Sequence, residues 1–441
     1  MNQSGIKRLI GVLCLMCVAL GAWAGGDKEA TNSTDGGPVT VNIWTKFNDT
    51  NPQNTQDQWM AATVAKLKTE NNMILKNTFV PYDQIVSKVN LAVQSGGDVP
   101  DISYVDSDID FFADNGTLMD ITDFVKTASW YKDISPVALA GVTARDGKIY
   151  AIPNLLGGHM LYYWTAAYPD GPPKTTEDIL KAGARLAKDG KFAITFKGSE
   201  STGTFMFYFQ LVETFGSTYT DKDGKSVFAT PGTVKAIEYL RTLFANRYAP
   251  EVALGAGFDF ETPFKDGNAG AFVAGSWSYV YLNPLTSPDG KVFDNGAQSV
   301  QDALNSGDMG IADPISVPGG KSYSFVSGFG GFGIPTGSKN VEGAKAFMNF
   351  MMDPTNAADY AVSYGGLPTV QGAMEDPRFA SSSYWTEVNA SINRTGKLVP
   401  FNANRKFFQK FGDVVITLIQ KPNLDIMTEL LKAQDELNSE L

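Results

Sequence analysis

The sequence is poor in the residues that most often bind metals or attack substrates. Its 441 residues include two cysteines and one histidine. Cys14 and Cys17 both lie in an apolar N-terminal segment, and His159 stands alone. We therefore expect a mature chain without disulfides, thiol nucleophile, transition-metal site or cofactor, and a histidine-based catalytic triad would depend on that one residue.

Basic residues are also scarce relative to acidic ones. The chain has 36 Lys and Arg residues and 47 Asp and Glu residues, which gives a formal net charge of -11 at pH 7. Such a surface repels phosphate backbones and anionic lipid, and no basic patch offsets it, so we expect no nucleic-acid partner. With 43% hydrophobic residues, the chain is instead typical of a globular protein large enough for two packed domains.

A long apolar run occurs at the N-terminus. It covers 9–20, follows Lys7 and Arg8, and precedes an A-x-A cleavage pattern at 22–24. The run is too short to span a membrane comfortably, and no stop-transfer charges follow it. This pattern predicts a secretory signal peptide over residues 1–24 and a mature protein in the periplasm.

The segment next to the predicted cleavage site carries two further expectations. A lipid anchor on Cys14 or Cys17 is disfavoured, because Leu13 and Met16 precede them where lipoproteins carry small residues. Residues 25–38 are polar and end in Gly-Gly-Pro, which predicts a flexible tether.

Strand and helix patterns alternate in the first part of the mature chain. Residues 39–43 alternate between apolar and polar, and apolar residues at helical spacing follow at 59–67. A second strand pattern covers 75–80, and a third ends in the acidic segment 106–108. Alternating strands and helices predict an α/β fold with a mainly parallel sheet, whose ligands bind at the carboxyl ends of its strands.

A second alternating series contains the aromatic residue that we consider the best candidate for a ligand contact. Residues 269–273 form a strand pattern, and Gly275 allows a turn just before Trp277. Hydroxyl-bearing neighbours, Ser276 and Ser278, flank the ring. Core packing is the alternative. An aromatic ring bordered by hydroxyls suits a ligand with an apolar face and a polar rim, as a sugar has.

Two other stretches have chemical interest. Tyr162, Tyr163 and Trp164 are consecutive, so on a strand one face packs in the core and the other is available to a cleft. The glycine-rich stretch 325–335 does not match the G-x-G-x-x-G pattern and starts no helix, which argues against a dinucleotide site.

Several motifs occur in the order found in one known family and cover nearly the whole mature chain. Together they are similar to the extracellular solute-binding proteins of bacterial ABC transporters, in the group of maltose- and oligosaccharide-binding proteins. The motifs are Gly96–Ile102, Asp146–Pro153 leading to Leu161–Tyr163, Phe264–Trp277, Gly330–Gly337 running into Ala344–Phe347, Gly366–Pro368 and Leu430–Leu441.

The resemblance implies a two-lobed periplasmic-binding-protein-like fold with a hinge and an interlobe cleft. Lobe I would comprise 38–153 and 327–363, and lobe II 154–326 and 364–441. The implied function is non-catalytic capture of a sugar or oligosaccharide by a monomer, followed by delivery to the membrane permease of an ABC transporter.

The resemblance also implies a set of ligand-binding residues. Trp277 matches the tryptophan on which the family stacks a sugar ring, and Asp106 and Asp108 match its strand-end carboxylates. Tyr163 and Trp164 lie where Asn-Lys commonly follows the tyrosines, so this chain departs from the family there. The full predicted set is Lys46, Phe47, Asn48, Asp106, Ser107, Asp108, Tyr163, Trp164, Ser199, Trp277, Gly328 and Phe329.

Two alternatives remain open from the sequence. A secreted glycoside hydrolase would need two carboxylates roughly 5–10 Å apart, one of them protonated, and Asp106 and Asp108 could share a face. Nothing in the sequence supplies the apolar pocket that would raise one pKa. The same fold could also bind a polyamine, a peptide or a ferric ion, since acidic groups and aromatic walls suit a cation.

Overall fold

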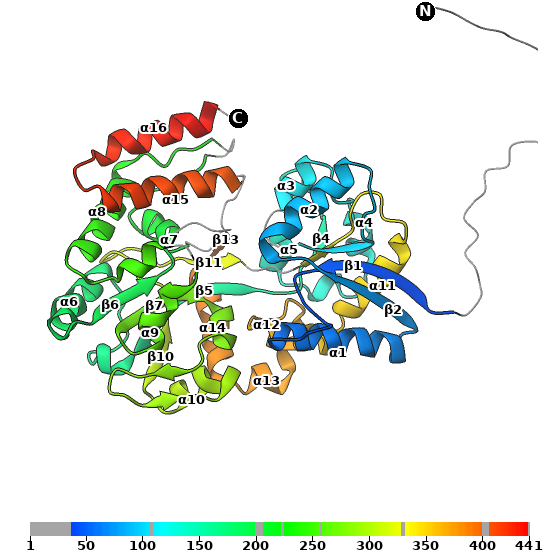
Figure 1. The fold of residues 1–441 in the computed structure, drawn as a ribbon, viewed down its shortest axis with the longest axis horizontal. Coiled ribbons are helices and arrows are strands. Elements are labelled where there is room, and N and C mark those ends of the chain that lie inside the picture. Colours follow the sequence, from blue (N-terminus) through cyan, green and yellow to red (C-terminus); the bar gives the residue numbers. More distant parts are fainter. Residues whose placement is uncertain are drawn as a thin grey trace, which may run out of the picture. The chain divides into compact units, whose positions relative to one another are not determined.

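Two β-sheets with helices packed around each organise the chain from Pro38 onward, which forms one compact unit (Figure 1). The computed structural model describes residues 37–105, 109–198, 206–221, 225–255, 257–327, 331–398 and 405–439. Among the described residues, no helix combines the length and the apolar character needed to cross a bilayer.

The first sheet has the strand order β2-β1-β3-β12-β4. β1 (Val39–Thr45) pairs in parallel with β2 (Met73–Phe79) and with β3 (Ile102–Val105). β12 (Gly331–Gly333) lies antiparallel between β3 and β4 (Ala151–Ile152). A segment from late in the chain therefore completes the sheet that the N-terminal half begins.

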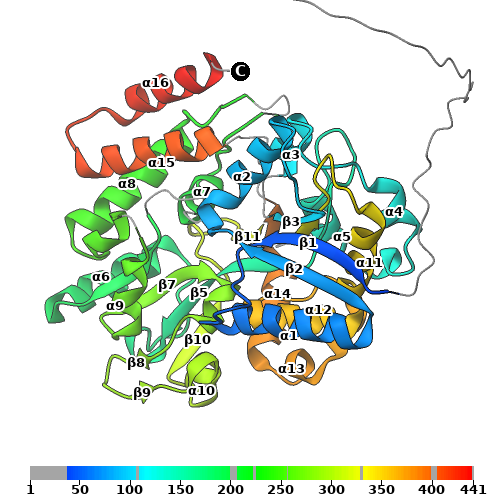
Figure 2. The same ribbon diagram turned by 45° about the vertical axis from the view of Figure 1, so that its right-hand side comes forward.

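Helices from the first quarter of the chain and from 341–364 cover this sheet (Figure 2). α1 (Thr55–Glu70) begins at Asn54, whose side chain accepts hydrogen bonds from the first-turn amides, and it packs on β2 and on α12 (Pro354–Tyr364). α2 (Tyr82–Gln94) contacts β3, and α11 (Val341–Met351) contacts β1. The predicted β-α alternation is confirmed here.

The second sheet is mixed. β5 lies at its centre and runs antiparallel to β7, β10 and β11, whereas β6 and β7 are parallel. Its strands are β5 (Gly157–Trp164), β6 (Phe192–Phe196), β7 (Ala269–Gly275), β10 (Met309–Ala312), β11 (Ser324–Ser327) and β13 (Gly396–Leu398).

Long helices pack around the second sheet. α6 (Thr176–Leu186) starts with a capping box between Thr175 and Asp178 and contacts β6. α15 (Arg405–Gln420) packs against both α8 (Pro231–Ala245) and α16 (Ile426–Ser439). The other helices and strands are α3 (Ile109–Asp114), α4 (Thr122–Thr127), α5 (Pro136–Gly141), α7 (Met206–Thr214), α9 (Thr262–Lys265), α10 (Ser299–Asn305), α13 (Pro377–Ala380), α14 (Ser383–Thr395), β8 (Leu285–Thr286) and β9 (Val292–Phe293).

The chain passes between the two sheets at points that lie side by side. Leu156, just before β5, exchanges backbone hydrogen bonds of 2.8 Å with Leu367, and the Thr369 hydroxyl donates to the carbonyl of Pro153. Gly365 turns the chain after α12 with a φ of 79°. A Cβ there would lie 3.0 Å from the carbonyl oxygen of Trp277, so the position favours glycine on both counts. These crossings agree with the predicted hinge, whereas the lobe boundaries stay a prediction.

Candidate ligand-binding site

The carboxyl ends of the parallel strands carry most of the candidate residues. Lys46 follows β1, Lys197 follows β6, and Trp277 follows β7. In open α/β sheets this is the edge at which ligands bind, because the loops there can vary without disturbing the sheet.

Lys46 lies in a cluster of tyrosines on the first sheet. Its Nζ donates a 2.7 Å hydrogen bond to the hydroxyl of Tyr364 and lies 4.4, 4.9 and 5.4 Å from the ring centroids of Tyr364, Tyr82 and Tyr104. The hydroxyls of Tyr104 and Tyr364 are 3.1 Å apart. The ammonium group of Lys46 therefore makes cation–π contacts with the surrounding tyrosine rings. The cluster places tyrosine hydroxyl groups beside a positive charge.

The two residues after Lys46 have structural roles. Phe47 is fully buried, with its ring edge-on to Trp59 and to Tyr104 at 5.6 Å, so its side chain is unavailable to a ligand in this structure. The Asn48 side chain accepts hydrogen bonds from Thr50 and Asn51, which closes the turn that leads to α1.

Trp277 is half-buried in the short 3₁₀ helix Ser276–Val280 directly after β7. Its ring meets the ring of His159 edge to face, with centroids 5.1 Å apart. The ring also folds back over Gly275, where a Cβ would lie 2.2 Å from two ring atoms. The sequence predicted that Gly275 lets the backbone turn, but its φ of -72° and ψ of 157° are open to any residue, and the glycine instead leaves room for the ring. The indole stays partly accessible.

The backbone that carries Trp277 is held by two buried tyrosines. The hydroxyl of Tyr162 donates to the carbonyl of Gly275, and the hydroxyl of Tyr384 to that of Ser276, over 3.1 and 2.6 Å. Burial raises the pKa of both hydroxyls, so both stay protonated donors at neutral pH. This support fixes the direction in which the indole leaves the strand.

His159 packs against the same tryptophan. It is buried, and its Nδ1 lies 3.2 Å from the carbonyl oxygen of Phe325. Burial lowers its pKa to about 4, so the ring is neutral at physiological pH. Within the described ranges, no group of three or more His, Cys, Asp or Glu could hold a metal ion.

The structure places Tyr163 and Trp164 away from Trp277. β5 runs antiparallel to β7, so His159 pairs with Gly275 whereas Tyr163 pairs with Ala271, near the start of β7. Trp164 is fully buried and stacks on Phe264 at 5.2 Å, and its indole nitrogen donates to that residue's carbonyl. The expectation that these two residues line the cleft is therefore corrected, because the strand direction takes them to the opposite edge.

Six predicted site residues lie outside the described residues, so their role stays a prediction. They are Asp106, Ser107, Asp108, Ser199, Gly328 and Phe329.

The sequence did not predict a hydrogen bond that joins a helix on the first sheet to the Trp277 segment of the second sheet. Gln56, in the first turn of α1, donates a 2.6 Å hydrogen bond to the hydroxyl of Tyr281, which follows the Trp277 turn. Tyr364 was also missed, although its place just before a Gly-Gly pair marks the end of a helix. The Gln56–Tyr281 bond shows that the Trp277 segment faces α1 of the first sheet.

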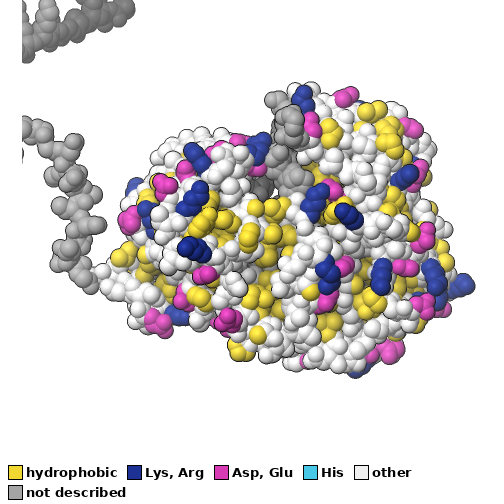
Figure 3. Space-filling view, turned by 180° about the vertical axis from the view of Figure 1, so that it is seen from behind, with side chains coloured by type: hydrophobic (Ala, Val, Ile, Leu, Met, Phe, Trp, Pro, Cys, Tyr) yellow, Lys and Arg dark blue, Asp and Glu magenta, His cyan; other side chains and the backbone are white. Residues whose placement is uncertain are grey.

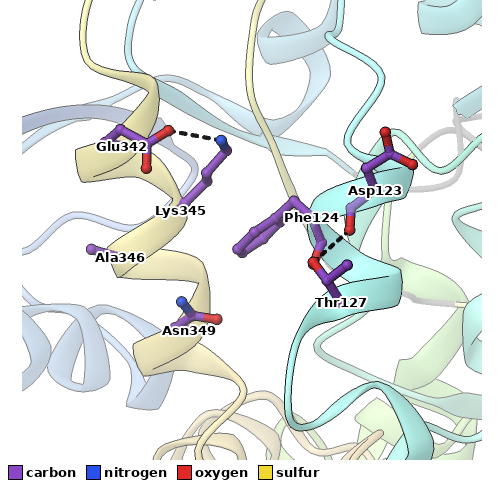
Figure 4. A pocket seen from close by; sticks show the side chains of 7 residues that line it. All are labelled: Asp123, Phe124, Thr127, Glu342, Lys345, Ala346 and Asn349. Carbon is purple, nitrogen blue, oxygen red and sulfur yellow. Dashed lines mark hydrogen bonds and ion pairs between the residues drawn. The ribbon is translucent and has the colours of Figure 1, made fainter.

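A hollow beside the first sheet is separate from the residues described above. It lies between α4 and α11, with a volume of about 510 Å³, and Figure 4 shows its lining side chains. Lys345 there pairs with Glu342 at 2.8 Å, and Asn349 accepts a hydrogen bond from the indole of Trp130. No strand end or predicted site residue lines it. On the face shown in Figure 3, acidic and basic side chains of the described residues are interspersed.

The fold and the strand-end site define a two-lobed α/β binding protein, and solved structures share that fold. The GacH receptor of Streptomyces glaucescens, solved unliganded and with acarbose, superposes with a TM-score of 0.74 at 17% identity, over 91% of this chain and 98% of the receptor. Maltose-bound MalE3 of T. maritima also gives 0.74 at 17% identity, over 91% of this chain and all of MalE3 (100%). The expected fold class is confirmed.

The sequence profile of the bacterial extracellular solute-binding proteins matches residues 62–386, and the chain belongs to this family. A curated relative is the maltooligosaccharide ABC transporter solute-binding lipoprotein of Streptococcus pneumoniae strain R6. It is 25% identical over 368 residues, which cover 80% of this chain and 77% of the relative. Members of the family serve as solute-binding components of transport, as the resemblance implied.

Proposed function

We propose that this protein captures a sugar or oligosaccharide between its lobes and delivers it to the permease of an ABC transporter. The observation that carries this proposal is the half-buried indole of Trp277, held at a strand end by two buried tyrosines on a segment that contacts α1 of the first sheet. An indole face covers the C–H side of a sugar ring, and neighbouring polar groups bind its hydroxyls. The name of the S. pneumoniae relative supports the same ligand class.

Closure of the two lobes would complete the site. The crossings at Leu156 and Gly365 lie beside the Trp277 turn, so rotation about them would change the distance between the Lys46 cluster and the indole. In this proposal the permease recognises the closed form, and the protein acts as a monomer.

A cationic ligand is a weaker candidate. The aromatic faces that could hold a cation at the first lobe are already occupied by Lys46, whose charge repels a second one. A glycosidase is also disfavoured, because the family consists of solute-binding components of transport.

Thermal shift with a ligand panel tests the proposal. We expect maltotriose or another neutral oligosaccharide to raise the melting temperature, and spermidine, a tripeptide and ferric citrate to leave it unchanged. An increase with spermidine and with no sugar would contradict the ligand class. Hydrolysis of a chromogenic glycoside, abolished by Asp106→Asn, would contradict the binding function itself.

The mature N-terminus tests the proposed periplasmic location. We expect cleavage after Ala24, which leaves Gly25 as the first residue. The relative from S. pneumoniae is named a lipoprotein, so the competing outcome is a diacylglyceryl group on Cys14 or Cys17. Mass spectrometry of the protein purified from a bacterial envelope distinguishes the two.

A further inference from the structure

The ammonium group of Lys46 lies in an aromatic cage built from four segments around the first sheet. Its Nζ lies 4.4 to 5.8 Å from four ring centroids. The rings belong to the next residue, to the first residue of α2, to β3 and to the last residue of α12, which are Phe47, Tyr82, Tyr104 and Tyr364. Aromatic faces around a cation are the arrangement by which proteins bind organic ammonium ligands.

Other described lysines that lie near aromatic rings have fewer described rings around them. The Nζ of Lys197 lies 4.5 and 5.2 Å from the ring centroids of Phe258 and Phe260. One described ring each lies near Lys66, Lys88, Lys291, Lys345 and Lys397. The rings around Lys46 come from segments that are distant in the sequence, so the tertiary structure brings this cage together.

The cage is held by core residues on one side and reaches solvent on the other. Phe47 and Tyr104 are fully buried, with ring centroids 5.6 Å apart, and Tyr364 is 8% exposed. The hydroxyls of Tyr104 and Tyr364 are 3.1 Å apart. Tyr82 is 36% exposed, and Lys46 itself is half-buried. The three buried rings therefore form a fixed wall, and Tyr82 forms the rim.

The chain itself fills this cage, which determines what else can bind there. Lys46 follows β1 directly, at the carboxyl edge of the parallel strands where ligands of open α/β sheets bind. An external ammonium group would need the same aromatic faces and would be repelled by the charge of Lys46. A neutral hydroxyl group meets no such repulsion, because its oxygen can accept a hydrogen bond from an ammonium group.

We propose that Lys46 is a specificity-determining residue, which occupies an aromatic cation cage from within and so excludes organic cations from this end of the binding site. This inference rests on the proposed function, which places the ligand at the strand ends. Without the lysine side chain, the cage would take a primary ammonium group on a short alkyl chain. Propylammonium is the matching ligand, because it has the same atoms as a lysine side chain beyond its Cβ.

Binding of propylammonium to Lys46→Ala tests the proposal. We expect this variant to bind the cation with a Kd on the order of 1–10 mM, and the wild type to bind it at least about tenfold more weakly. Thermal shift should show the same difference, with sodium chloride at equal concentration as the salt control. 1-Propanol has the same chain without the charge and should stabilise neither protein. Spermidine, which ends in an aminopropyl group, should stabilise only Lys46→Ala.

Two matched variants separate occupation of the cage from loss of charge. Methionine refills the cage with an uncharged side chain of similar length, so Lys46→Met should bind propylammonium at least about fivefold more weakly than Lys46→Ala. Lys88 on α2 is exposed, and its Nζ lies 4.5 Å from a single ring centroid, that of Trp44. Lys88→Ala removes the same charge near the same sheet and should gain no binding.

The rim residue tests whether the rings themselves bind the cation. Tyr82→Leu in the Lys46→Ala background should weaken propylammonium binding by about two- to fivefold, because one exposed cation–π contact is lost. Thermal melts of all variants without ligand verify that each is folded. If Lys46→Ala is unfolded, Lys46→Thr takes its place with the same expected outcome, because threonine also vacates the cage and suits the end of a strand.

The outcomes separate the cage from the proposed function. Equal propylammonium affinity of Lys46→Ala and the wild type would overturn the role of Lys46, whether or not the wild type binds a sugar. Equal affinity of Lys46→Ala and Lys46→Met would overturn it as well, because occupation of the cage would then make no difference. Binding of propylammonium by Lys46→Ala, with no sugar stabilising the wild type, would support the cage and contradict the proposed ligand class.

Discussion

Substitution of Gly275 by alanine tests whether the placement of the Trp277 ring, rather than its mere presence, determines affinity. An added Cβ would lie 2.2 Å from two atoms of the indole, where ordinary contact begins at 3.4 Å. The ring must therefore move by about 1.2 Å, since side chains at van der Waals contact do not compress further. The backbone itself accepts alanine, because φ and ψ of Gly275 are -72° and 157°.

The cost to stability should be small. Overpacking of an enclosed site costs about 1–3 kcal/mol, and a half-buried ring can swing toward solvent. Replacement of glycine also lowers the entropy of the unfolded chain, which offsets about 0.4–1 kcal/mol. We therefore expect a loss of about 1 kcal/mol in the free energy of unfolding. The affinity for maltotriose should fall by about 3- to 10-fold, because an aligned aromatic contact contributes about 0.5–1.5 kcal/mol beyond its buried area.

Gly270 in the same strand provides the matched control. A Cβ there would meet the Cβ of Ala167 at 2.8 Å and the rings and methyls of Tyr168 and Leu186 within 3.2 Å, at the end of β7 away from Trp277. Gly270→Ala should lower stability at least as much as Gly275→Ala and leave affinity unchanged. Denaturant melts and calorimetry measure both quantities. Equal affinity of Gly275→Ala and wild type, or equal loss in both variants, would refute the reasoning.

Three further perturbations have defined outcomes. Trp277→Ala should weaken maltotriose binding by more than tenfold but lower the melting temperature only modestly, since the ring is half-buried. A large drop in melting temperature together with the loss of affinity would instead show that Trp277 is a core residue. Glu261→Gln should become more stable relative to wild type as pH rises. Burial raises the pKa of the Glu261 carboxyl from 4.5 to about 7 in the folded state, so the folded wild type holds this proton more tightly than the unfolded chain does. The wild type is therefore at its most stable, with respect to this group, below pH 4.5 and loses that stability as pH rises through about 7. Urea melts at about pH 5 and about pH 8 should show a difference on the order of 1–2 kcal/mol that appears only at the higher pH, and a constant difference would argue against the raised pKa. Asn154→Leu should stabilise the protein by about 1 kcal/mol, because both polar atoms of this fully buried side chain lack partners among the described residues; a clear drop in melting temperature would show that the amide is satisfied.

Local sequence patterns predicted individual strands and one candidate site residue, Trp277. The alternation at 39–43 predicted β1, and the run at 269–273 predicted β7, each within two residues of its observed end. Because ligands meet parallel sheets at strand carboxyl ends, the second of these strands drew attention to Trp277, whereas Lys46 was predicted from the family resemblance. Strands and turns can be predicted in this way because side-chain periodicity and turn-forming glycines depend on only a few neighbouring residues.

The tertiary structure decided everything that depends on pairing between distant segments. β12 enters the first sheet from late in the chain, and the antiparallel direction of β5 takes Tyr163 and Trp164 to the edge opposite Trp277. The contact of Lys46 with Tyr364 and that of Gln56 with Tyr281 join residues more than two hundred positions apart. No local pattern encodes such pairs, because strand order and direction follow from which faces bury each other when the whole chain packs.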